Sequence, residues 1–352
     1  MLVSQIETPA LILDLDILER NIKTMQSFAA KRMLGLRPHY KSHKSTVIAH
    51  KQIDAGAKGL CCAKVGEALD LVNAGIEDIL IANEVIDMAK IACVADLANK
   101  CRLTVCVDSA ENVRDLSNAA ALFGSKIFCL VEYNIGMDRC GVNSFEDVLT
   151  LAKLVDKLPN LAFEGIQAYA GHMAHEKDFA QRKEYSEKID RHLHELKQYL
   201  EDNGLQVKEV SGASTGTSFL RPEDTVYTEI QPGSYIFMDA SYNTLHLEFE
   251  NSLFLLTTVI SKNGERSICD LGAKCVGLDQ EKPVLRDYPE RLIKCNEEHC
   301  TISDGKDFKV GDKLYMIPGH CCTTVNLHDH IYFVREGKVV DRVPVTSRGK
   351  SM

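Results

Sequence analysis

Several features are missing from this sequence of 352 residues, and each absence argues against a class of protein. No apolar run approaches the roughly 20 residues that a membrane-spanning helix needs. The start, from Met1 to Glu7, has neither a charged region nor a long apolar stretch, so we expect no secretory signal. Basic charge is outnumbered, with 41 Lys and Arg against 50 Asp and Glu. The net charge of −9 argues against a nucleic-acid or acidic-membrane partner.

The 13 cysteines form no CxxC pair, which argues against a structural zinc finger. Their number is odd and they are scattered through apolar segments. Most are therefore expected to be small buried hydrophobic residues, as in cytosolic proteins. We expect a soluble cytoplasmic globular protein, long enough for one large domain and a smaller one.

Between residues 16 and 240, short apolar runs alternate with longer amphipathic stretches. This alternation predicts a parallel sheet, and eight repeats favour a (β/α)8 TIM-type barrel over an open sheet. An open sheet would also be expected to carry a Gly-rich dinucleotide loop, and none is present. The predicted strands are Gly35–Lys41, Gly59–Ala63, Asp78–Ala82, Leu103–Val107, Ile127–Glu132, Phe163–Tyr169, Val207–Gly212 and Thr228–Gly233. The predicted helices are Asp16–Lys31, Val65–Ala74, Ala110–Leu122, Phe145–Leu158 and Lys177–Asn203.

After residue 240 the pattern changes to short β-rich segments separated by turn signals such as Asn263-Gly264 and Glu336-Gly337. Strands are predicted at Leu253–Ser261, Arg266–Asp270, Lys313–Ile317 and Ile331–Arg335. Residues 241–352 are therefore predicted to form an all-β domain. The opening apolar run, Pro9–Leu15, is expected to join it, so that residues 1–15 complete this domain and residues 16–240 form the barrel.

A cationic stretch, Arg37-Pro38-His39-Tyr40-Lys41-Ser42-His43-Lys44, contains a candidate catalytic lysine. Lys41 is predicted at the carboxyl end of the first barrel strand, where the pocket of such a barrel lies. In a strand, Arg37, His39 and Lys41 would share one face. Neighbouring cations and partial burial favour a free amine that can form an imine with a cofactor aldehyde. An isolated lysine would more often be a solvated strand end, but the surrounding segment favours function.

Two Gly/Ser/Thr segments follow the last two predicted strands, Ser214-Thr215-Gly216-Thr217 and Gly233-Ser234-Tyr235. Such segments offer clustered backbone N–H groups and hydroxyls, which suit a phosphate. Turns of this composition are common, but barrels often bind phosphate after their last strands. Arg139, in a Gly-rich loop, is either a surface residue or lies against a cofactor ring.

His320 and Cys322 offer two metal ligands, expected on one face of an extended segment. Two ligands do not complete a metal shell, so water or substrate would fill it. The alternative is a buried cysteine pair with a capping histidine. Glu298 and His299 either add to the shell or are ordinary loop residues.

Taken in order, the motifs resemble those of D-threonine aldolases and eukaryotic-type D-serine dehydratases. These are fold-type III pyridoxal-phosphate enzymes related in architecture to alanine racemase. The resemblance spans nearly the whole chain and implies an alanine-racemase-like barrel, a C-terminal β domain and a homodimer with the active site near the subunit boundary. The motifs that carry it are Thr8-Pro9-Ala10, Arg37 to Lys44, Gly136-Met137-Asp138-Arg139-Cys140-Gly141-Val142, Gln167-Ala168-Tyr169, Ser214 to Thr217, Gln231-Pro232-Gly233-Ser234-Tyr235 and Pro318 to Asn326.

The resemblance also implies roles for individual residues. Lys41 would hold pyridoxal phosphate covalently, Arg139 would contact the pyridoxal ring edge, and Tyr169 would lie beside the cofactor. His175 would act as a base on the substrate hydroxyl, with His172 as the second candidate. The residues that would cradle the phosphate are Thr215, Gly216, Thr217, Gly233, Ser234 and Tyr235. The divalent metal would be bound by His320 and Cys322.

The family implies two reactions on D-β-hydroxy amino acids, and this sequence has features of both. An aldolase breaks Cα–Cβ and leaves glycine and an aldehyde, whereas a dehydratase leaves a 2-oxo acid and ammonia. The Pro318-Gly319-His320-Cys321 opening and the continuation from Val325 to Asp329 resemble the aldolases. Against this, Cys322 stands where aldolases usually carry Asp, and it resembles the zinc-dependent dehydratases. Cysteine favours Zn²⁺ over Mn²⁺ or Mg²⁺. We favour the aldolase, with 3-hydroxyaspartate among the candidate substrates.

Two further hypotheses come from other classes. A non-catalytic pyridoxal-phosphate carrier would share the lysine and phosphate segments but would need neither His320 nor Cys322. A racemase would need a second base, for which Tyr242 is a candidate, but the metal pair would then be unexplained.

Overall fold

The structure is a computed structural model that describes residues 1–352. It divides into two compact units, which are described one at a time. The β unit comprises Met1–Met25, Ser42–Ile48 and Ser234–Gly349. The barrel unit comprises Gln26–Lys41, Ala49–Gly233 and Lys350–Met352. No helix in the chain is both long and apolar enough to cross a membrane.

The barrel unit is built on an eight-stranded sheet with the order β2-β9-β8-β7-β6-β5-β4-β3, in which every pair of neighbours is parallel. A parallel bridge between His39 and Cys61 joins the segments at the two ends of this order, so the sheet curls back on itself. The prediction of an eight-stranded parallel α/β barrel is confirmed. Its strands are β2 (Gly35–Leu36), β3 (Leu60–Cys62), β4 (Asp78–Glu84), β5 (Arg102–Val107), β6 (Ile127–Glu132), β7 (Leu161–Ala168), β8 (Glu209–Gly212) and β9 (Glu229–Ile230).

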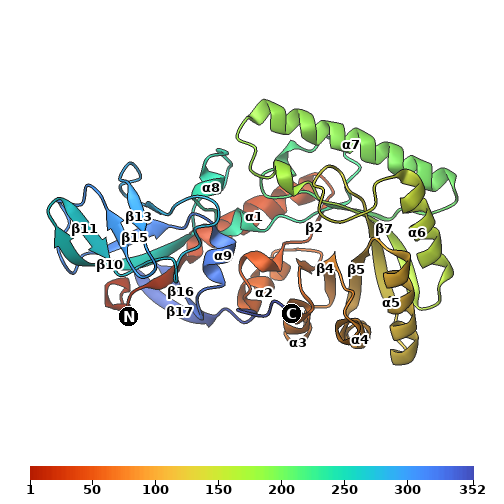
Figure 1. Cartoon of the computed structure of the whole chain (residues 1–352), viewed down its shortest axis with the longest axis horizontal. Coiled ribbons are helices and arrows are strands. Elements are labelled where there is room, and N and C mark those ends of the chain that lie inside the picture. Colours follow the sequence, from red (N-terminus) through yellow and green to blue (C-terminus); the bar gives the residue numbers. More distant parts are fainter. The chain divides into compact units, whose positions relative to one another are not determined.

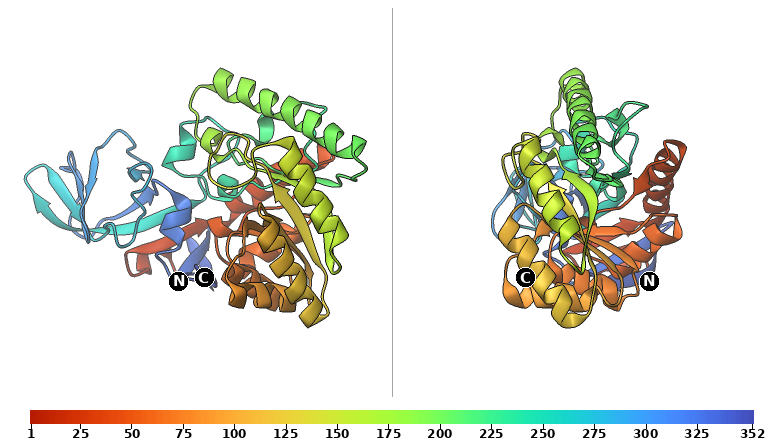
Figure 2. Two further views of the ribbon diagram at one scale, coloured as in Figure 1. Left: turned by 45° about the vertical axis from the view of Figure 1, so that its right-hand side comes forward. Right: turned by 90° about the vertical axis from the view of Figure 1, so that its right-hand side faces the viewer.

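Helices alternate with these strands. Figure 1 shows α3 to α6 following one another along the outer side of the sheet, and the left view of Figure 2 shows the same orange-to-yellow helices outside the strands. Polar residues begin several of them: Ser109 accepts the backbone N–H of Asn112, and Ser144 accepts that of Asp147. The helices are α2 (Thr46–Asp54), α3 (Val65–Asn73), α4 (Met88–Leu97), α5 (Ala110–Phe123), α6 (Phe145–Lys157) and α7 (Phe179–Asp202).

Apolar side chains from strands and helices meet in one core of the barrel unit. Ile79, Val105 and Ile166 of the strands and Leu116 and Val148 of the helices are fully buried there. A second, smaller cluster is formed by strand side chains of alternate direction, Cys61, Leu80, Cys106 and Leu130. The strands are therefore buried on both faces, as is usual for a parallel sheet covered by helices.

The β unit contains a nine-stranded sheet in which β1, at the start of the chain, pairs antiparallel with β10 and parallel with β16. The hairpin turns fall at Asn263-Gly264 and Glu336-Gly337, where the glycines adopt positive φ angles. The strands are β1 (Ala10–Asp14), β10 (Leu253–Asn263), β11 (Arg266–Cys269), β12 (Val284–Leu285), β13 (Ile293–Cys295), β14 (Cys300–Ile302), β15 (Lys313–Ile317), β16 (His330–Arg335) and β17 (Lys338–Pro344). The predicted all-β sheet is confirmed.

The remaining elements are mostly short. They are the helices α1 (Leu15–Lys31), α8 (Ala240–Asn243) and α9 (Cys321–Val325), and the 3-10 turns η1 (Val3–Gln5), η2 (Tyr40–Ser42), η3 (Gly171–Met173), η4 (Ser218–Leu220) and η5 (Ser234–Ile236).

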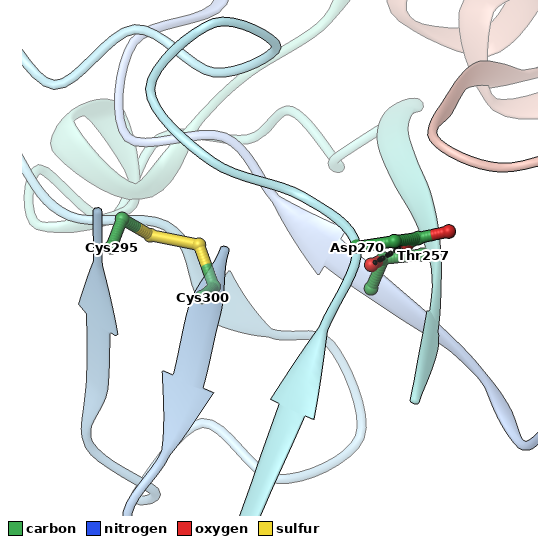
Figure 3. The surroundings of a disulfide bond; sticks show 4 residues. All are labelled: Thr257, Asp270, Cys295 and Cys300. Carbon is green, nitrogen blue, oxygen red and sulfur yellow. Dashed lines mark hydrogen bonds between the residues drawn. A yellow bond between two sulfur atoms is a disulfide. The ribbon is translucent and has the colours of Figure 1, made fainter. Parts of the chain in front are cut away.

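One disulfide joins Cys295 and Cys300, which lie opposite each other on β13 and β14 (Figure 3). Beside it, Thr257 of β10 donates a hydrogen bond to Asp270. Six of the free cysteines are buried, namely Cys61, Cys62, Cys106, Cys129, Cys269 and Cys321. The disulfide was not expected from the sequence, because the two cysteines do not form a recognised spacing motif.

Candidate functional site

The barrel unit holds a cavity of about 230 Å³ that contains the candidate cofactor lysine. Its lining residues include side chains that follow several strands, which is where barrels carry their active sites. They are His39, Lys41, Ala63, Ala82, Asn83, Arg139, Cys140, Gln167, Tyr169 and Gln231. A second cavity of about 440 Å³ lies beside α7 and contains none of the predicted site residues.

The expectation that Lys41 ends a strand is wrong. The strand β2 stops at Leu36, and Lys41 lies in the 3-10 turn η2. Pro38 has no backbone N–H to donate to a regular ladder. Past Leu36 the pairing continues at single residues: the N–H groups of Arg37 and His39 bind the carbonyls of Ile230 and Pro232, and the Pro38 carbonyl accepts the N–H of Cys61. Past this point the chain turns, and Lys41 reaches the cavity from a turn.

Arg37 does not act as a neighbouring cation of Lys41, because its charge is compensated inside the barrel unit. Its guanidinium donates to Glu229 at 2.9 and 3.0 Å and to Asp78 at 2.8 Å. Both side chains of the Arg37–Glu229 pair are almost fully buried. Burial disfavours the charged guanidinium, but these carboxylates outweigh it and raise the pKa of Arg37 above its ordinary value. We therefore assign Arg37 a structural role.

Three of the predicted cofactor residues come together in the cavity. Nζ of Lys41 lies 5.9 Å from the ring centroid of Tyr169, and Cζ of Arg139 lies 5.7 Å from the same ring. Gly171 allows this arrangement, because a Cβ atom there would lie 2.5 Å from Cε1 of Tyr169. The cavity therefore combines a primary amine, an aromatic wall and a guanidinium.

The loop that carries Arg139 is held by the side chain of Asn134. Its Oδ1 accepts the N–H groups of Gly136 and Asp138 at 3.1 and 3.0 Å. Its Nδ2 donates to Asp138 and Asn143, both at 2.9 Å. This local network fixes the Gly-rich loop although Arg139 itself is exposed.

Two carboxyls, the half-buried Glu84 and the buried Glu132, end the strands β4 and β6 near Arg139. Burial and the neighbouring Glu84 raise the pKa of Glu132 to about 8, although Arg139 opposes the shift. Oε1 of Glu84 is buried without a hydrogen-bond partner. Glu132 therefore favours its protonated form, because burial and a neighbouring carboxyl both disfavour its charge.

The two candidate bases lie in the segment that follows β7. Nε2 of His172 is 2.8 Å from the hydroxyl of Tyr185 on α7, and burial lowers the pKa of His172 below its ordinary value. The Tyr185 hydroxyl also lies 3.4 Å from the carbonyl oxygen of Ile135. His175 is half-buried one turn later. His172 is therefore in contact with α7, and the choice between the two bases stays a prediction.

The predicted phosphate segments are split between the two units. In the barrel unit, Thr217 accepts the N–H of Ser214 at 3.0 Å, and the Ser214–Thr217 turn follows Ala213, whose φ is +62°. In this turn Thr215, Gly216 and Thr217 are buried, and Gly233 ends the unit half-buried. Tight turns of this kind point successive N–H groups the same way.

In the β unit, Ser234 and Tyr235 begin the turn η5. The Tyr235 ring is fully buried and packs against Phe249 at 5.6 Å between centroids. Tyr235 therefore offers a phosphate its backbone N–H rather than its ring. Oγ of Ser234 lies 3.6 Å from Sγ of Cys322.

The predicted metal ligands lie at the start of a helix, so the expectation of an extended segment is wrong. His320 is the N-cap of α9, and Cys322 lies in its first turn. The N–H of Cys321 is bound by the buried Asp239 at 2.9 Å, which fixes this end of the helix. A five-residue helix shows no 3.6-residue periodicity in the sequence, which is why the prediction missed it.

The chemistry of His320 and Cys322 suits a divalent metal. A hydrogen bond with Cys321 lowers the pKa of Cys322, burial opposes this shift, and His320 adds to it. The pKa is held well below its ordinary value, which favours the thiolate. Burial opposes protonation of His320, but Cys322 and Asp279 raise its pKa to about 9. Oγ of Ser42 lies 3.4 Å from Sγ of Cys322.

Glu298 and His299 are not brought to His320. Glu298 pairs with Lys274 at 3.0 Å, and His299 is exposed. No group of three or more His, Cys, Asp and Glu side chains in the chain is placed to hold a metal ion. The pair His320 and Cys322 is therefore a two-ligand candidate whose shell would need water or substrate.

The residues present fit both groups that the sequence implies. Pyridoxal phosphate needs an amine, a flat wall and a phosphate turn, and the barrel unit offers Lys41, Tyr169 and the turn at Thr217. A divalent ion needs deprotonated donors, and Cys322 favours its thiolate next to His320.

Sequence reasoning did not find Asn134, Tyr185 and Asp279. Tyr185 and Asp279 act on residues of distant segments, whereas Asn134 acts on the loop that directly follows it. The Asn134-x-Gly136 spacing in the loop was the only available signal, since an Asn side chain often binds the backbone two residues on.

Comparison with known proteins gives a consistent result. Residues 13–241 match the model of the alanine racemase N-terminal domain, and residues 252–334 match a putative serine dehydratase domain. The chain is 41% identical to a 3-hydroxy-D-aspartate aldolase of Paracoccus denitrificans, with 99% of this chain and 93% of the relative covered. It is 38% identical to a D-threonine aldolase of an Arthrobacter species, with coverage of 99% and 94%. Relatives at 26% and 23% identity are named dehydratases.

The solved structures agree. The crystal structure of a D-threonine aldolase from Filomicrobium marinum superposes with a TM-score of 0.97 at 38% identity, covering 99% of this chain and 98% of the other. With the barrel, the β sheet and nearly full-length identity to named aldolases, this chain belongs to the alanine-racemase-like family that contains D-threonine aldolases and 3-hydroxy-D-aspartate aldolases.

Proposed function

We propose that this protein is a lyase that uses pyridoxal phosphate and a divalent metal ion to cleave D-β-hydroxy amino acids. The favoured activity is that of a D-threonine aldolase, which yields glycine and an aldehyde. The observation that carries the proposal is the cavity that holds Lys41 and Arg139 against Tyr169, in a chain that matches named aldolases over 99% of its length.

In this proposal Lys41 would hold the cofactor, which when bound would supply an electron sink for cleavage of the Cα–Cβ bond. Tyr169 and Arg139, which lie near each other and near Lys41 in the cavity, would hold the cofactor ring. The phosphate is held by backbone N–H groups and hydroxyls of two turns. The residues assigned to that task are Thr215, Gly216, Thr217, Gly233, Ser234 and Tyr235.

His175 is assigned as the base that takes the proton of the substrate β-hydroxyl, with His172 as the alternative. Removal of this proton makes the oxygen electron-rich, so that it can form the aldehyde as the bond to Cα breaks. Both histidines lie in the segment that follows β7.

His320 and Cys322 are assigned as ligands of the metal, which is Zn²⁺ or Mn²⁺ with Mg²⁺ as an alternative. A bound divalent cation acidifies a hydroxyl group that reaches its open positions. The thiolate of Cys322 favours Zn²⁺ because sulfur is a soft ligand. Ser42, which contacts Cys322, directly follows Lys41 in the chain.

A second candidate function is a D-serine or 3-hydroxy-D-aspartate dehydratase. The observation that favours it is Cys322 itself, a thiolate ligand next to His320. His320 and Cys322 would then hold a metal that supplies Lewis-acid chemistry for loss of the hydroxyl, and the products would be a 2-oxo acid and ammonia.

The setting of the enzyme is also part of the proposal. Residues 16–240 form the cofactor-binding barrel domain, and residues 241–352 with the strand of residues 1–15 form the β domain that carries the metal ligands. The protein acts in the cytoplasm as a homodimer on a small D-amino acid, without a nucleic-acid or membrane partner.

Product analysis tests the proposal. The purified protein, loaded with pyridoxal phosphate and with Zn²⁺ or Mn²⁺, is given D-threonine or 3-hydroxy-D-aspartate. Glycine with acetaldehyde or glyoxylate supports the aldolase. Ammonia with 2-oxobutyrate or oxaloacetate supports the dehydratase, and L-isomers without cleavage would make the protein a racemase. A carrier would bind the cofactor and give no product.

Two variants separate the cofactor from the metal. Lys41→Ala is expected to abolish the visible absorbance band of the bound cofactor. His320→Ala is expected to keep that band and to lose the metal. A band that survives in Lys41→Ala would refute the lysine assignment, and unchanged metal content in His320→Ala would refute the ligand assignment.

A further inference from the structure

The segment between β11 and β12 packs closely against α9. Gly277 donates its N–H to Thr324 at 3.0 Å. A Cβ atom on Gly277 would lie 2.1 Å from Oγ1 of Thr323. A side chain would therefore separate this segment from the helix, and its absence lets the next residues reach the side chains of α9.

Asp279, two residues further along the chain, contacts side chains of this helix and of its N-cap with both carboxylate oxygens. Its Oδ2 lies 2.6 Å from Nδ1 of His320, and its Oδ1 accepts a hydrogen bond of 2.6 Å from the Thr323 hydroxyl. The two partners are three residues apart, at the N-cap and in the first turn of α9. The Thr323 bond fixes the rotation of the carboxylate, so that its other oxygen faces the imidazole.

This contact decides which nitrogen of His320 is available to a cation. A carboxylate can only accept, so Nδ1 carries the hydrogen and Nε2 keeps its lone pair once its own proton has left. A carboxylate bound to the second ring nitrogen also raises the basicity of a ligating histidine and fixes its orientation.

We infer that Asp279 is the positioning residue of the metal site, orienting His320 so that Nε2 is the ligand atom. This rests on the proposed function, because it assumes that His320 binds the metal. Thr323 has a supporting part, since it holds the carboxylate in place.

We expect Asp279 to contribute little to the stability of the fold. Its side chain is 46% exposed, and an ion pair open to water contributes little to stability. Its removal is therefore expected to act on metal affinity while thermal unfolding changes little.

Metal binding by the purified full-length protein tests the inference, with Zn²⁺ as the ligand in equilibrium dialysis. Asp279→Ala is expected to weaken Zn²⁺ about 10- to 100-fold. Asp279→Asn, which keeps an acceptor oxygen for Nδ1–H, should recover part of the loss. Thr324→Val is the control for anchoring, because it removes the bond from the Gly277 N–H and the bond from Thr324 to the His320 carbonyl, but leaves Asp279 facing the imidazole.

The outcomes separate the inference from the proposed function. If the unaltered protein does not bind Zn²⁺, or if His320→Ala binds it as tightly as the unaltered protein does, the proposed metal site is wrong. If His320→Ala loses Zn²⁺ and Asp279→Ala binds as the unaltered protein does, the inference alone is overturned. Equal losses in Asp279→Ala and Thr324→Val would also overturn it, because anchoring of the segment would then be the cause.

Spectroscopy of the Co²⁺-substituted protein gives a spectrum that would not change if Asp279 had only a structural role. Loss of an outer hydrogen bond is expected to shift the ligand-field bands while the number of ligands stays the same. Loss of one oxygen ligand in Asp279→Ala by X-ray absorption would make Asp279 a direct ligand and would overturn the positioning role.

Discussion

Gly171 gives the sharpest test of the cofactor cavity, because its lack of a side chain sets the position of Tyr169. In Gly171→Ala the new Cβ would lie 2.5 Å from Cε1 of Tyr169 and 2.8 Å from Cε of Met137. The flexible end of Met137 can move, but the tyrosine ring has to shift by about 1 Å to restore an ordinary contact. The backbone of Gly171 is not in the left-handed region, so alanine adds no strain there.

The expected cost follows from this geometry. Inserting one methyl group into a packed site typically costs about 1–3 kcal/mol. Because the Tyr169 ring is the wall next to Lys41 and Arg139, we expect much of this cost to fall on cofactor binding. The dissociation constant of pyridoxal phosphate should rise about 10-fold, since 1.4 kcal/mol corresponds to that factor. Absorbance titration of the metal-loaded protein measures it.

A double-mutant cycle locates the cause. In a Tyr169→Ala background, Gly171→Ala should cause no further loss of affinity, because the ring is gone. In a Met137→Ala background the loss should persist. Cofactor affinity in Gly171→Ala equal to that of the unaltered protein would refute the reasoning, as would a loss that persists without the Tyr169 ring.

Three further predictions concern the surroundings of the cavity. Arg37→Met removes the buried guanidinium whose Nε donates to both oxygens of Glu229, so denaturant unfolding should show a loss of about 3–5 kcal/mol; a loss under about 1 kcal/mol would contradict the buried pair. In Glu132 the pKa is raised from 4.5 to about 8, so its contribution to stability is present below the lower value and is lost as pH rises through the higher one. Between about pH 6 and about pH 9, the free energy of unfolding should therefore fall more for the unaltered protein than for Glu132→Gln. Equal falls in the two proteins would count against the raised pKa of Glu132. Tyr185→Phe removes the hydroxyl bound to His172, so thermal unfolding should show a loss of about 1 kcal/mol with unchanged cofactor affinity; impaired cofactor binding would show that this pair does more than hold the segment.

The long elements of the barrel could be predicted because each has a clear period. The helix expected at Phe145–Leu158 is observed at Phe145–Lys157, with buried residues on one face. The strand expected at Ile127–Glu132 is observed with the same bounds. In such segments the burial pattern is set by neighbours in sequence, so a single chain is sufficient to find it.

Short elements were predicted less well. The strand expected to reach Lys41 ends at Leu36, and the segment from His320 to Cys322 is the start of a helix. Neither segment is long enough for a period to appear. Pro38 was the one local sign that the strand would end before Lys41. The residue types at both places were still informative, because Lys41 lies in a cavity and Cys322 favours a thiolate.

Contacts between distant residues could not be predicted from the sequence. Asp279 lies 41 positions before His320, in a segment without a motif. Tyr185 meets His172 only because α7 folds back on the segment after β7. Both depend on tertiary packing, which no local pattern encodes.

Peptide mapping would identify the lysine that holds the cofactor. The protein loaded with pyridoxal phosphate is treated with borohydride, which fixes the cofactor on the lysine that binds it, and is then digested for mass spectrometry. We expect the cofactor mass on Lys41. The same mass on Lys44 or on any other lysine, or no labelled peptide, would refute the role proposed for Lys41.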